Sequence, residues 1–328
     1  MRHPMSLAAI VVFVVAIGLV WWRVATSDPF AGPEPTPTSA APATPAGPSP
    51  QEPAGPSPAG APTPAAPASA ALVAAACSGE LGVRDLSAIV DPELDEISGI
   101  AASRLHDGVL WAIEDSLNPA DLIAIGADGA TLATIEVGAV NFDWEDLAAG
   151  LGPDGAPWLY IADIGDNFGV RSRVSVLALP EPELADGSVT PTELRLDIEG
   201  GPVDAEALVV TGHGYWLIAK VADGSAAPIY LAEPGSERLA RVGSLDAGGQ
   251  AVTAADVTPD GSALVVRTYQ RVLVYPIVDG DLRTAGAVGA CEAPAIDEPQ
   301  GESLAVTADS TAIVTVSEGA GAVLHELS

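Results

Sequence analysis

DWEDLA at residues 143–148 and IADIGDN at residues 161–167 are the two halves of the stretch that decides the fold of this 328-residue chain. Degraded copies of the first half recur as EISGIA (96–101), DAEALV (204–209), TAADVT (253–258) and QGESLA (300–305). The aliphatic residue of each copy marks the repeat at Ile100, Leu147, Leu208, Val257 and Leu304, with spacings of 47, 61, 49 and 47 residues. A period of about 47 residues is typical of four-stranded propeller blades.

The repeat therefore predicts an all-β domain over residues 77–328, a β-propeller of five four-stranded blades. The 61-residue interval leaves six blades as the alternative. Asp-Gly occurs seven times between apolar runs, which is a strong hairpin signal. The segment GELGVRDL (79–86) precedes the first copy, and we expect it to close the ring as the outer strand of the last blade. A weak fourth strand of the fourth blade is expected near residues 285–290.

The N-terminal part has a different composition. Residues 1–5 are predicted to be a cytoplasmic tail, and the apolar run 6–23 a transmembrane anchor that ends in an aromatic pair, Trp21-Trp22. Cleavage of this run as a signal segment is the alternative, and the protein would then be secreted. Residues 24–76 are rich in Pro and Ala and are predicted to be a disordered linker. The expected location is the cell membrane, single-pass, with the propeller outside the cytoplasm.

Charge and cysteine content restrict the partners. The chain has 44 acidic and 13 basic residues, a net charge of −31. Such a surface repels nucleic acid and attracts cations or basic partners, so contact with the membrane is expected only through the N-terminal helix. The two cysteines, Cys77 and Cys291, lie in the part predicted to be extracytoplasmic, where a disulfide is stable. We predict that they pair and pin the closing strand.

Charged residues are predicted to gather on one face of the ring, where the blades connect and the second-to-third strand loops lie. The starts of the first strands place Ser98, Glu145, Glu206, Ala255 and Glu302 there. The ends of the second strands add one charge from each blade, namely Glu114, Asp163, Lys220, Arg267 and Glu318. Lys220 is the only lysine of the chain.

This face has two interpretations. It is either a ring of salt bridges that closes the channel, because desolvated charges must be paired, or a site for a ligand or cation. Hard oxygen ligands of the kind found here suit Ca²⁺. The predicted metal ligands are Asp163, Asp166, Asn167 and Glu145. The predicted ligand-binding residues are Glu114, Glu145, Asp146, Asp163, Lys220, Arg267, Glu302 and Glu318.

Histidine is missing from the charged face. His106 and His213 fall in turns of the opposite face, and His325 falls on a strand. This disfavours a Ser-His-Asp nucleophile and a histidine-ligated zinc site on the charged face.

The motifs DWEDLA, LYIADIGDN, DAEAL, AADVTPDG and QGESLAV together resemble secreted bacterial β-propeller proteins, most of which have no assigned activity. The resemblance covers residues 97–318. More distantly, the chain looks like the propellers that include calcium-dependent phosphatases and lactonases. We therefore expect a membrane-tethered module that binds an extracytoplasmic ligand or protein through its acidic face, with Ca²⁺ as cofactor. The distant resemblance implies the alternative, a metal-dependent hydrolase of phosphoesterase or lactonase type on the same face.

Overall fold

The computed structural model describes residues 67–287 and 289–328, which belong to one compact unit. The predicted anchor 6–23 and the linker up to residue 66 lie outside these residues. Among the residues described, no helix is long and apolar enough to cross a membrane.

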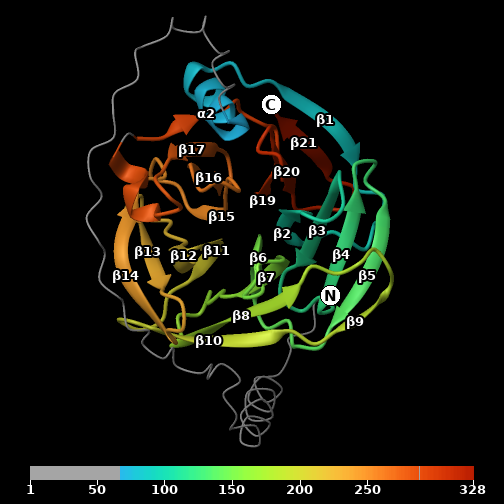
Figure 1. Ribbon diagram of the computed structural model, residues 1–328, viewed down its shortest axis with the longest axis horizontal. Coiled ribbons are helices and arrows are strands. Elements are labelled where there is room, and N and C mark those ends of the chain that lie inside the picture. The colour runs from blue at the N-terminus through green and yellow to red at the C-terminus, as the bar shows by residue number, and fades with distance from the viewer. Residues whose placement is uncertain (1–66, 288) are drawn as a thin grey trace, which may run out of the picture. The chain divides into compact units, whose positions relative to one another are not determined.

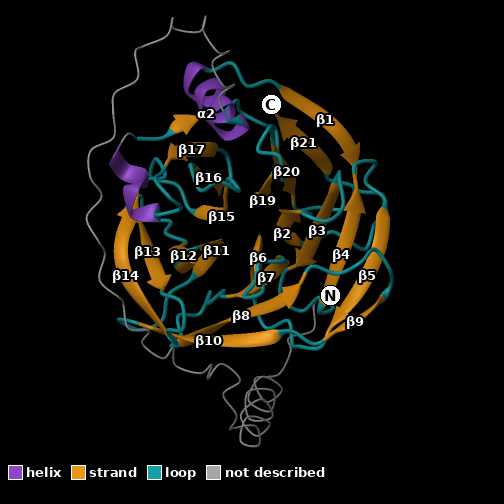
Figure 2. Ribbon diagram, in the orientation of Figure 1, coloured by secondary structure: helices purple, strands orange, loops and turns teal. Residues whose placement is uncertain are grey.

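Four-stranded antiparallel sheets are arranged around a common centre (Figures 1 and 2). The innermost strand of each sheet contacts the innermost strands of its two neighbours, so that these strands form a closed ring. The arrangement is consistent with the predicted β-propeller. In the described part of the chain the innermost strands are β2 (Ile97–Ala102), β6 (Trp144–Leu151), β11 (Ala205–Thr211), β15 (Val252–Val257) and β19 (Gly301–Val306).

The remaining strands follow outward in chain order, except that β1 is the outer strand of blade 5, and blades 1 to 5 are numbered after their innermost strands. The second strands are β3 (Val109–Glu114), β7 (Pro157–Asp163), β12 (Gly214–Ala219), β16 (Ala263–Thr268) and β20 (Ile313–Ser317). The third strands are β4 (Asp121–Gly126), β8 (Arg173–Pro180), β13 (Ala227–Ala232), β17 (Val272–Pro276) and β21 (Val323–Leu327). The outer strands are β5 (Thr131–Val137), β10 (Thr192–Ile198), β14 (Arg238–Leu245), β18 (Cys291–Glu292) and β1 (Val83–Ala88).

The hydrophobic core is divided into clusters that lie between neighbouring blades. One cluster joins blades 1 and 2 and includes the fully buried Trp111 and Trp144, and another joins blades 3 and 4 around Trp216. Similar clusters fill the spaces between blades 2 and 3, 4 and 5, and 5 and 1. Each inner strand is covered on both faces, which explains why these strands are apolar along their length apart from the repeat motif.

The ring is closed as predicted. Strand β1 pairs antiparallel with β21, with Val83 opposite Leu327, so the N-terminal segment supplies the outer strand of blade 5. Cys77 and Cys291 are at disulfide distance, with Cα atoms 4.7 Å apart, which confirms their predicted pairing. The bond ties the chain just before β1 to the outer strand of blade 4.

Two predicted segments differ from the structure. The Ala-rich run after Pro67 forms the helix α2 (Ala68–Ser78), because alanine favours helix once the prolines end. All of this helix but its last two residues lies in the range predicted as linker. Leu72 and Ala76 of this helix are buried against blades 4 and 5. A fourth strand of blade 4 was expected near residues 285–290. The chain instead forms the 3₁₀ helix η1 (Leu282–Ala287) there, and the fourth strand, β18, begins only at Cys291.

The long interval between the second and third repeat copies holds an additional edge strand. Strand β9 (Gly187–Val189) pairs parallel with β5, the outer strand of blade 1. The next strand, β10, pairs parallel with β14 through Asp197 and Arg238, which joins blades 2 and 3 into one eight-stranded sheet. Both strands lie at the outer edge of the ring in Figure 1. The extra residues thus cover blade edges.

Candidate functional site

Every innermost strand carries a β-bulge at the same position. The pairing register of each inner strand with its second strand skips one residue near the start of the inner strand. A bulge re-aims a side chain and is common next to functional sites. The skipped residues, which are equivalent around the ring, are Ser98, Glu145, Glu206, Thr253 and Glu302.

The bulges correct the predicted repeat in blade 4. The residue equivalent to Leu147 is Ala255, not Val257, and Thr253 rather than Ala255 occupies the bulge. A strand has a period of two, so a shift of two residues leaves the apolar pattern intact and cannot be seen in the sequence. The Thr253 hydroxyl donates to the carbonyl oxygen of Gly301 at 2.9 Å, so this bulge residue links blade 4 to blade 5.

The five charged residues predicted at the ends of the second strands do not occupy equivalent positions. Relative to the inner strands they lie at three different positions. Glu114 and Asp163 lie opposite the first residues of β2 and β6. Lys220 and Glu318 lie one residue further along, beyond the last strand pair, where their amides bond to the connection before the inner strand. Arg267 lies inside β16, opposite Ala254. Neighbouring strand residues point to opposite faces, so these side chains do not form one ring.

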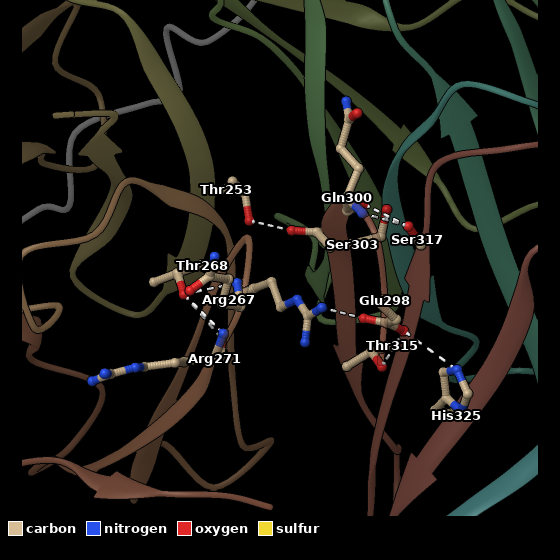
Figure 3. A network of polar contacts seen from close by, with 12 residues as sticks. Thr253, Arg267, Thr268, Arg271, Glu298, Gln300, Ser303, Thr315, Ser317 and His325 are labelled. Carbon is tan, nitrogen blue, oxygen red and sulfur yellow. Dashed lines mark hydrogen bonds and ion pairs between the residues drawn. The ribbon is translucent and has the colours of Figure 1, made fainter. Parts of the chain in front are cut away.

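Arg267 is part of the interior between blades 4 and 5. Its side chain is 1% exposed and forms an ion pair with Glu298, which also accepts a hydrogen bond from the Thr315 hydroxyl at 2.9 Å (Figure 3). A Cβ at Gly301 would overlap the guanidinium group, so the glycine of QGESLA makes room for it. Glu298 comes from an irregular connection, which is why the sequence pattern did not reveal it.

Asp146 is also structural. It is fully buried, and its carboxylate accepts hydrogen bonds from the backbone N–H groups of Leu147 and Leu208 at 2.8 Å and of Ala255 at 3.4 Å. Burial raises the pKa of Asp146 well above its usual range although these N–H groups favour the charged form. The side chain connects the inner strands of blades 2, 3 and 4 and cannot contact a ligand.

The predicted metal ligands of the IADIGDN motif are engaged elsewhere. Asp163 forms an ion pair with Arg171 at 2.7 Å, and Arg171 also lies 4.8 Å from the centre of the Phe142 ring. The Asp166 carboxylate accepts hydrogen bonds from the amides of Val170 and Arg171, both at 2.8 Å, and so orders its own loop. Asn167 is exposed. Of the predicted metal set only Glu145 joins the acidic group described next.

Asp115, Asp143 and Glu145 form a compact acidic group. Among the described residues, they are the ones whose ligand atoms could hold a metal ion, and these atoms lie within 4.8 Å of one another. Asp115 follows β3, Asp143 precedes β6, and Glu145 is the bulge residue of blade 2. A Cβ at Gly165 would overlap Glu145 Oε1 and would lie 2.5 Å from Asp143 Oδ2. The glycine of IADIGDN therefore leaves the space that the two carboxylates occupy.

The acidic group has too little positive charge to balance it. Burial, with Asp115 next, raises the pKa of Asp143 to about 6. Burial, followed by the charges of Glu206, Asp115 and Asp143, raises the pKa of Glu145 to about 11. Like charges in a partly desolvated site cannot all ionise, so the group holds protons that a bound cation would replace.

Lys220 pairs with the bulge glutamate of blade 3, whereas Asp163 and Arg267, the charges at the ends of the neighbouring second strands, are paired elsewhere. Its ammonium forms an ion pair with Glu206 and lies 5.4 Å from the centre of the Tyr269 ring. Burial opposes the charge of Lys220, but Glu206 outweighs it and raises the pKa of the ammonium. Burial, against the opposing effect of Lys220, raises the pKa of Glu206 to about 8.

A second carboxyl pair lies in blade 5. Glu302 and Glu318 both accept hydrogen bonds from the Gln300 amide nitrogen, which is 3.1 Å from Glu302 Oε1. Burial, then a hydrogen bond with Glu302, raises the pKa of Glu318 to about 9. The predicted ligand-binding residues Glu302 and Glu318 thus lie together at the Gln300 amide, and Glu318 keeps its proton at neutral pH.

Four buried side-chain atoms of the described residues have no hydrogen-bond partner, and two of them are oxygen atoms on the inner part of blade 1. These two oxygen atoms are Ser98 Oγ, at the bulge of blade 1, and Glu114 Oε1, at the end of β3 next to Asp115. Ser98 is 2% exposed and Glu114 is 6% exposed. A buried unpaired polar atom is costly, and a ligand or ion is one way to satisfy it.

Sequence reasoning found Glu145, Glu206 and Glu302 but did not single out Asp115 and Asp143 as ligands. Both are adjacent to chosen positions, in the loop after β3 and in the DWEDLA motif. One signal could have found them. Two acids occur close together in the sequence at the end of β3, as Glu114 and Asp115, and again at the start of β6, as Asp143 and Glu145.

Comparison of the sequence with protein-family models and with curated proteins gives no match. Among solved structures, the soluble aldose sugar dehydrogenase of Escherichia coli in the apo-form is similar to this chain. The two share 11% identical residues over 76% of this chain and 99% of the other, with a TM-score of 0.43. At this identity the similarity concerns the fold alone. The resemblance to secreted bacterial propellers stays a prediction.

Proposed function

We propose that this chain is a five-bladed β-propeller that acts as a binding module, and that Asp115, Asp143 and Glu145 hold Ca²⁺. The observation that carries the proposal is that three carboxylates from two blades converge where Gly165 leaves room for them. We further propose that residues 6–23 tether the module to the cell membrane with the propeller outside the cytoplasm.

The chemistry of the acidic group suits a divalent cation. Ca²⁺ takes six to eight oxygen ligands in flexible geometry, and carboxylates provide one or two each. Ca²⁺ would neutralise charges that otherwise raise the pKa values of Asp143 and Glu145. The unpartnered Ser98 Oγ and Glu114 Oε1 are further oxygen atoms for the ion or for a water molecule bound to it.

The test is the melting temperature with EDTA and with millimolar Ca²⁺. Ca²⁺ that binds only the folded protein raises its stability by about 2.7 kcal/mol when present at a hundred times its dissociation constant. Gly165→Ala should abolish the shift, because its Cβ would occupy the space of Glu145 and Asp143. Gly212→Ala is the matched control, since its Cβ would meet no atom within 4 Å. A wild-type protein that melts at the same temperature in both buffers would refute the cation site.

A metal-dependent hydrolase on the same face is the second candidate. The observation that favours it is Glu318, whose pKa of about 9 keeps a carboxyl protonated at neutral pH, as a general acid requires. Hydrolysis of a simple phosphoester or lactone that EDTA abolishes and Glu318→Gln slows would establish the enzyme. A melting temperature that rises with Ca²⁺, in a protein that hydrolyses neither substrate, would reject the hydrolase and favour the binding module.

A further inference from the structure

The face that carries the acidic group also carries an apolar rim. We define the mouth face as the face formed by the connections between blades and the loops between second and third strands. Five large apolar side chains are exposed there in the loops of blades 1 and 2: Leu117, Val140, Phe142, Phe168 and Val170. Leu117 is 97% exposed and Phe168 is 90% exposed, although burying such side chains is what normally stabilises a fold.

The rim is asymmetric. The mouth-face loops of blades 3 and 4, at residues 220–226, 246–251 and 269–271, have no large apolar side chain among those exposed in the described residues. The rim therefore lies on the side of the ring where Asp115 and Asp143 lie. Phe142 is in contact with Arg171, which pairs with Asp163, so Arg171 links the rim to a carboxylate at the end of β7. Adjoining apolar side chains of this kind mark an interaction site.

A groove continues from the rim toward the outside of blade 1. It is an open cavity of about 560 Å³ whose walls include Pro119–Ala120 and Val137–Ala139, from the connections that carry Leu117 and Val140. Its acidic lining residues are Asp121, Glu136 and Asp186. Burial, then the charge of Glu136, raises the pKa of Asp121. Along the chain, the rim residues Leu117, Val140 and Phe142 thus lie between residues of the groove and carboxylates of the acidic group.

We propose that the mouth face over blades 1 and 2 is a docking surface for a segment of a partner protein whose central residues are apolar and whose flanking residues are lysine or arginine. Charge complementarity selects the basic residues, since carboxylates lie in the groove and in the acidic group. The rim selects the apolar residues. The inference rests on the proposed function only in taking this face as the binding face.

The test measures binding of a fluorescein-labelled octapeptide, Lys-Lys-Phe-Leu-Phe-Leu-Lys-Lys, by anisotropy in EDTA and in millimolar Ca²⁺. Two matched peptides replace every Phe and Leu by Ser or every Lys by Glu. The protein variant Leu117→Ser/Phe168→Ser removes two exposed rim side chains. Val278→Ser is the control, because Val278 is 61% exposed and lies on the opposite face, after β17.

We expect the Lys/Phe/Leu peptide to bind, and the rim variant to weaken its binding about tenfold or more while Val278→Ser leaves it unchanged. The Ser peptide and the Glu peptide should bind at least about tenfold more weakly than the parent peptide. Equal affinity of the Ser peptide would overturn the proposal, since the surface would then bind charge alone. Failure of the parent peptide to bind, or binding that the rim variant leaves intact, would overturn it as well.

The two proposals fail separately. A Ca²⁺ shift of the melting temperature without peptide binding would retain the cation site and reject the docking surface. Peptide binding that depends on the rim, in a protein that shows no Ca²⁺ shift, would retain the docking surface and reject the cation site.

Discussion

The bulge residues show how a single position can determine the electrostatics of this molecule. Ser98, Glu145, Glu206, Thr253 and Glu302 are equivalent, yet only the glutamates of blades 2, 3 and 5 place a carboxyl at the bulge. Lys220 pairs with the glutamate of blade 3, while the glutamates of blades 2 and 5 lie beside other acids. The protein therefore folds with protonated carboxyls on this face.

This protonation predicts how stability depends on pH. The pKa values of Asp143, Glu206 and Glu318 in the folded state, about 6, 8 and 9, exceed those of unfolded carboxyls. Between about pH 4 and pH 9 the folded state binds more protons than the unfolded state, so stability falls as pH rises. We expect guanidinium denaturation in EDTA to give the highest free energy of unfolding at pH 5 and the lowest at pH 9.

Glu318→Gln should make this decline less steep between about pH 5 and pH 9, because the glutamine binds no titrating proton in either the folded or the unfolded state. Glu237→Gln, at an exposed position, is the control and should leave the profile unchanged. Stability that increases from pH 5 to pH 9 in the wild type would contradict the prediction.

At this scale the sequence indicated residue types better than residue contacts. Acids at the inner-strand starts were predicted, and Glu145, Glu206 and Glu302 are there. The partners Arg171 and Glu298 were not, since both lie in irregular loops. No periodic pattern relates a loop residue to the strand residue that it contacts.

The inner strands are held together by buried carboxylates as well as by apolar packing. Asp146 bonds to backbone N–H groups of blades 2, 3 and 4, and Asp256 accepts a hydrogen bond from Val306 of blade 5 at 2.8 Å. Near the centre of the ring, inner strands of different blades lie next to one another without pairing in one sheet. The hydrogen bonds of Asp146 and Asp256 connect these strands.

Asp146→Ala should destabilise the fold by roughly 3–5 kcal/mol, because backbone N–H groups in the interior would lose their acceptor. The measurement is the free energy of unfolding by guanidinium, with the exposed Asp107→Ala as the matched control. A loss no larger than that of the control would mean that water replaces the carboxylate.

Most strands could be predicted, because apolar runs indicate the strands and Asp-Gly turns mark where they end. Six of the seven Asp-Gly glycines have positive φ, between 69° and 83°, as hairpin turns require. The exception, Gly187, begins β9. The bulges, β9 and the β10–β14 pairing could not be predicted, because a bulge leaves the apolar pattern nearly intact and an edge pairing leaves no pattern.

As a whole the ring depends on one covalent closure. The Cys77–Cys291 bond spans 214 residues, and a loop of this length should contribute ~4–5 kcal/mol in the chain-entropy model. We expect a reducing agent to lower the melting temperature of the wild type and to leave that of the Cys77→Ser/Cys291→Ser variant unchanged. If the fully reduced wild type melted at the temperature of the oxidised protein, the bond would have no role in stability.

The order in which the chain enters the ring determines how it carries mechanical load. A pull on the chain ahead of α2 reaches Cys77 before it reaches Val83 of β1. The covalent bond passes the force to Cys291 at the edge of blade 4, and β1 remains paired with β21 without tension. In a domain tethered through residues 6–23, as proposed above, the strand that keeps the ring shut would thereby be shielded from drag on the tether.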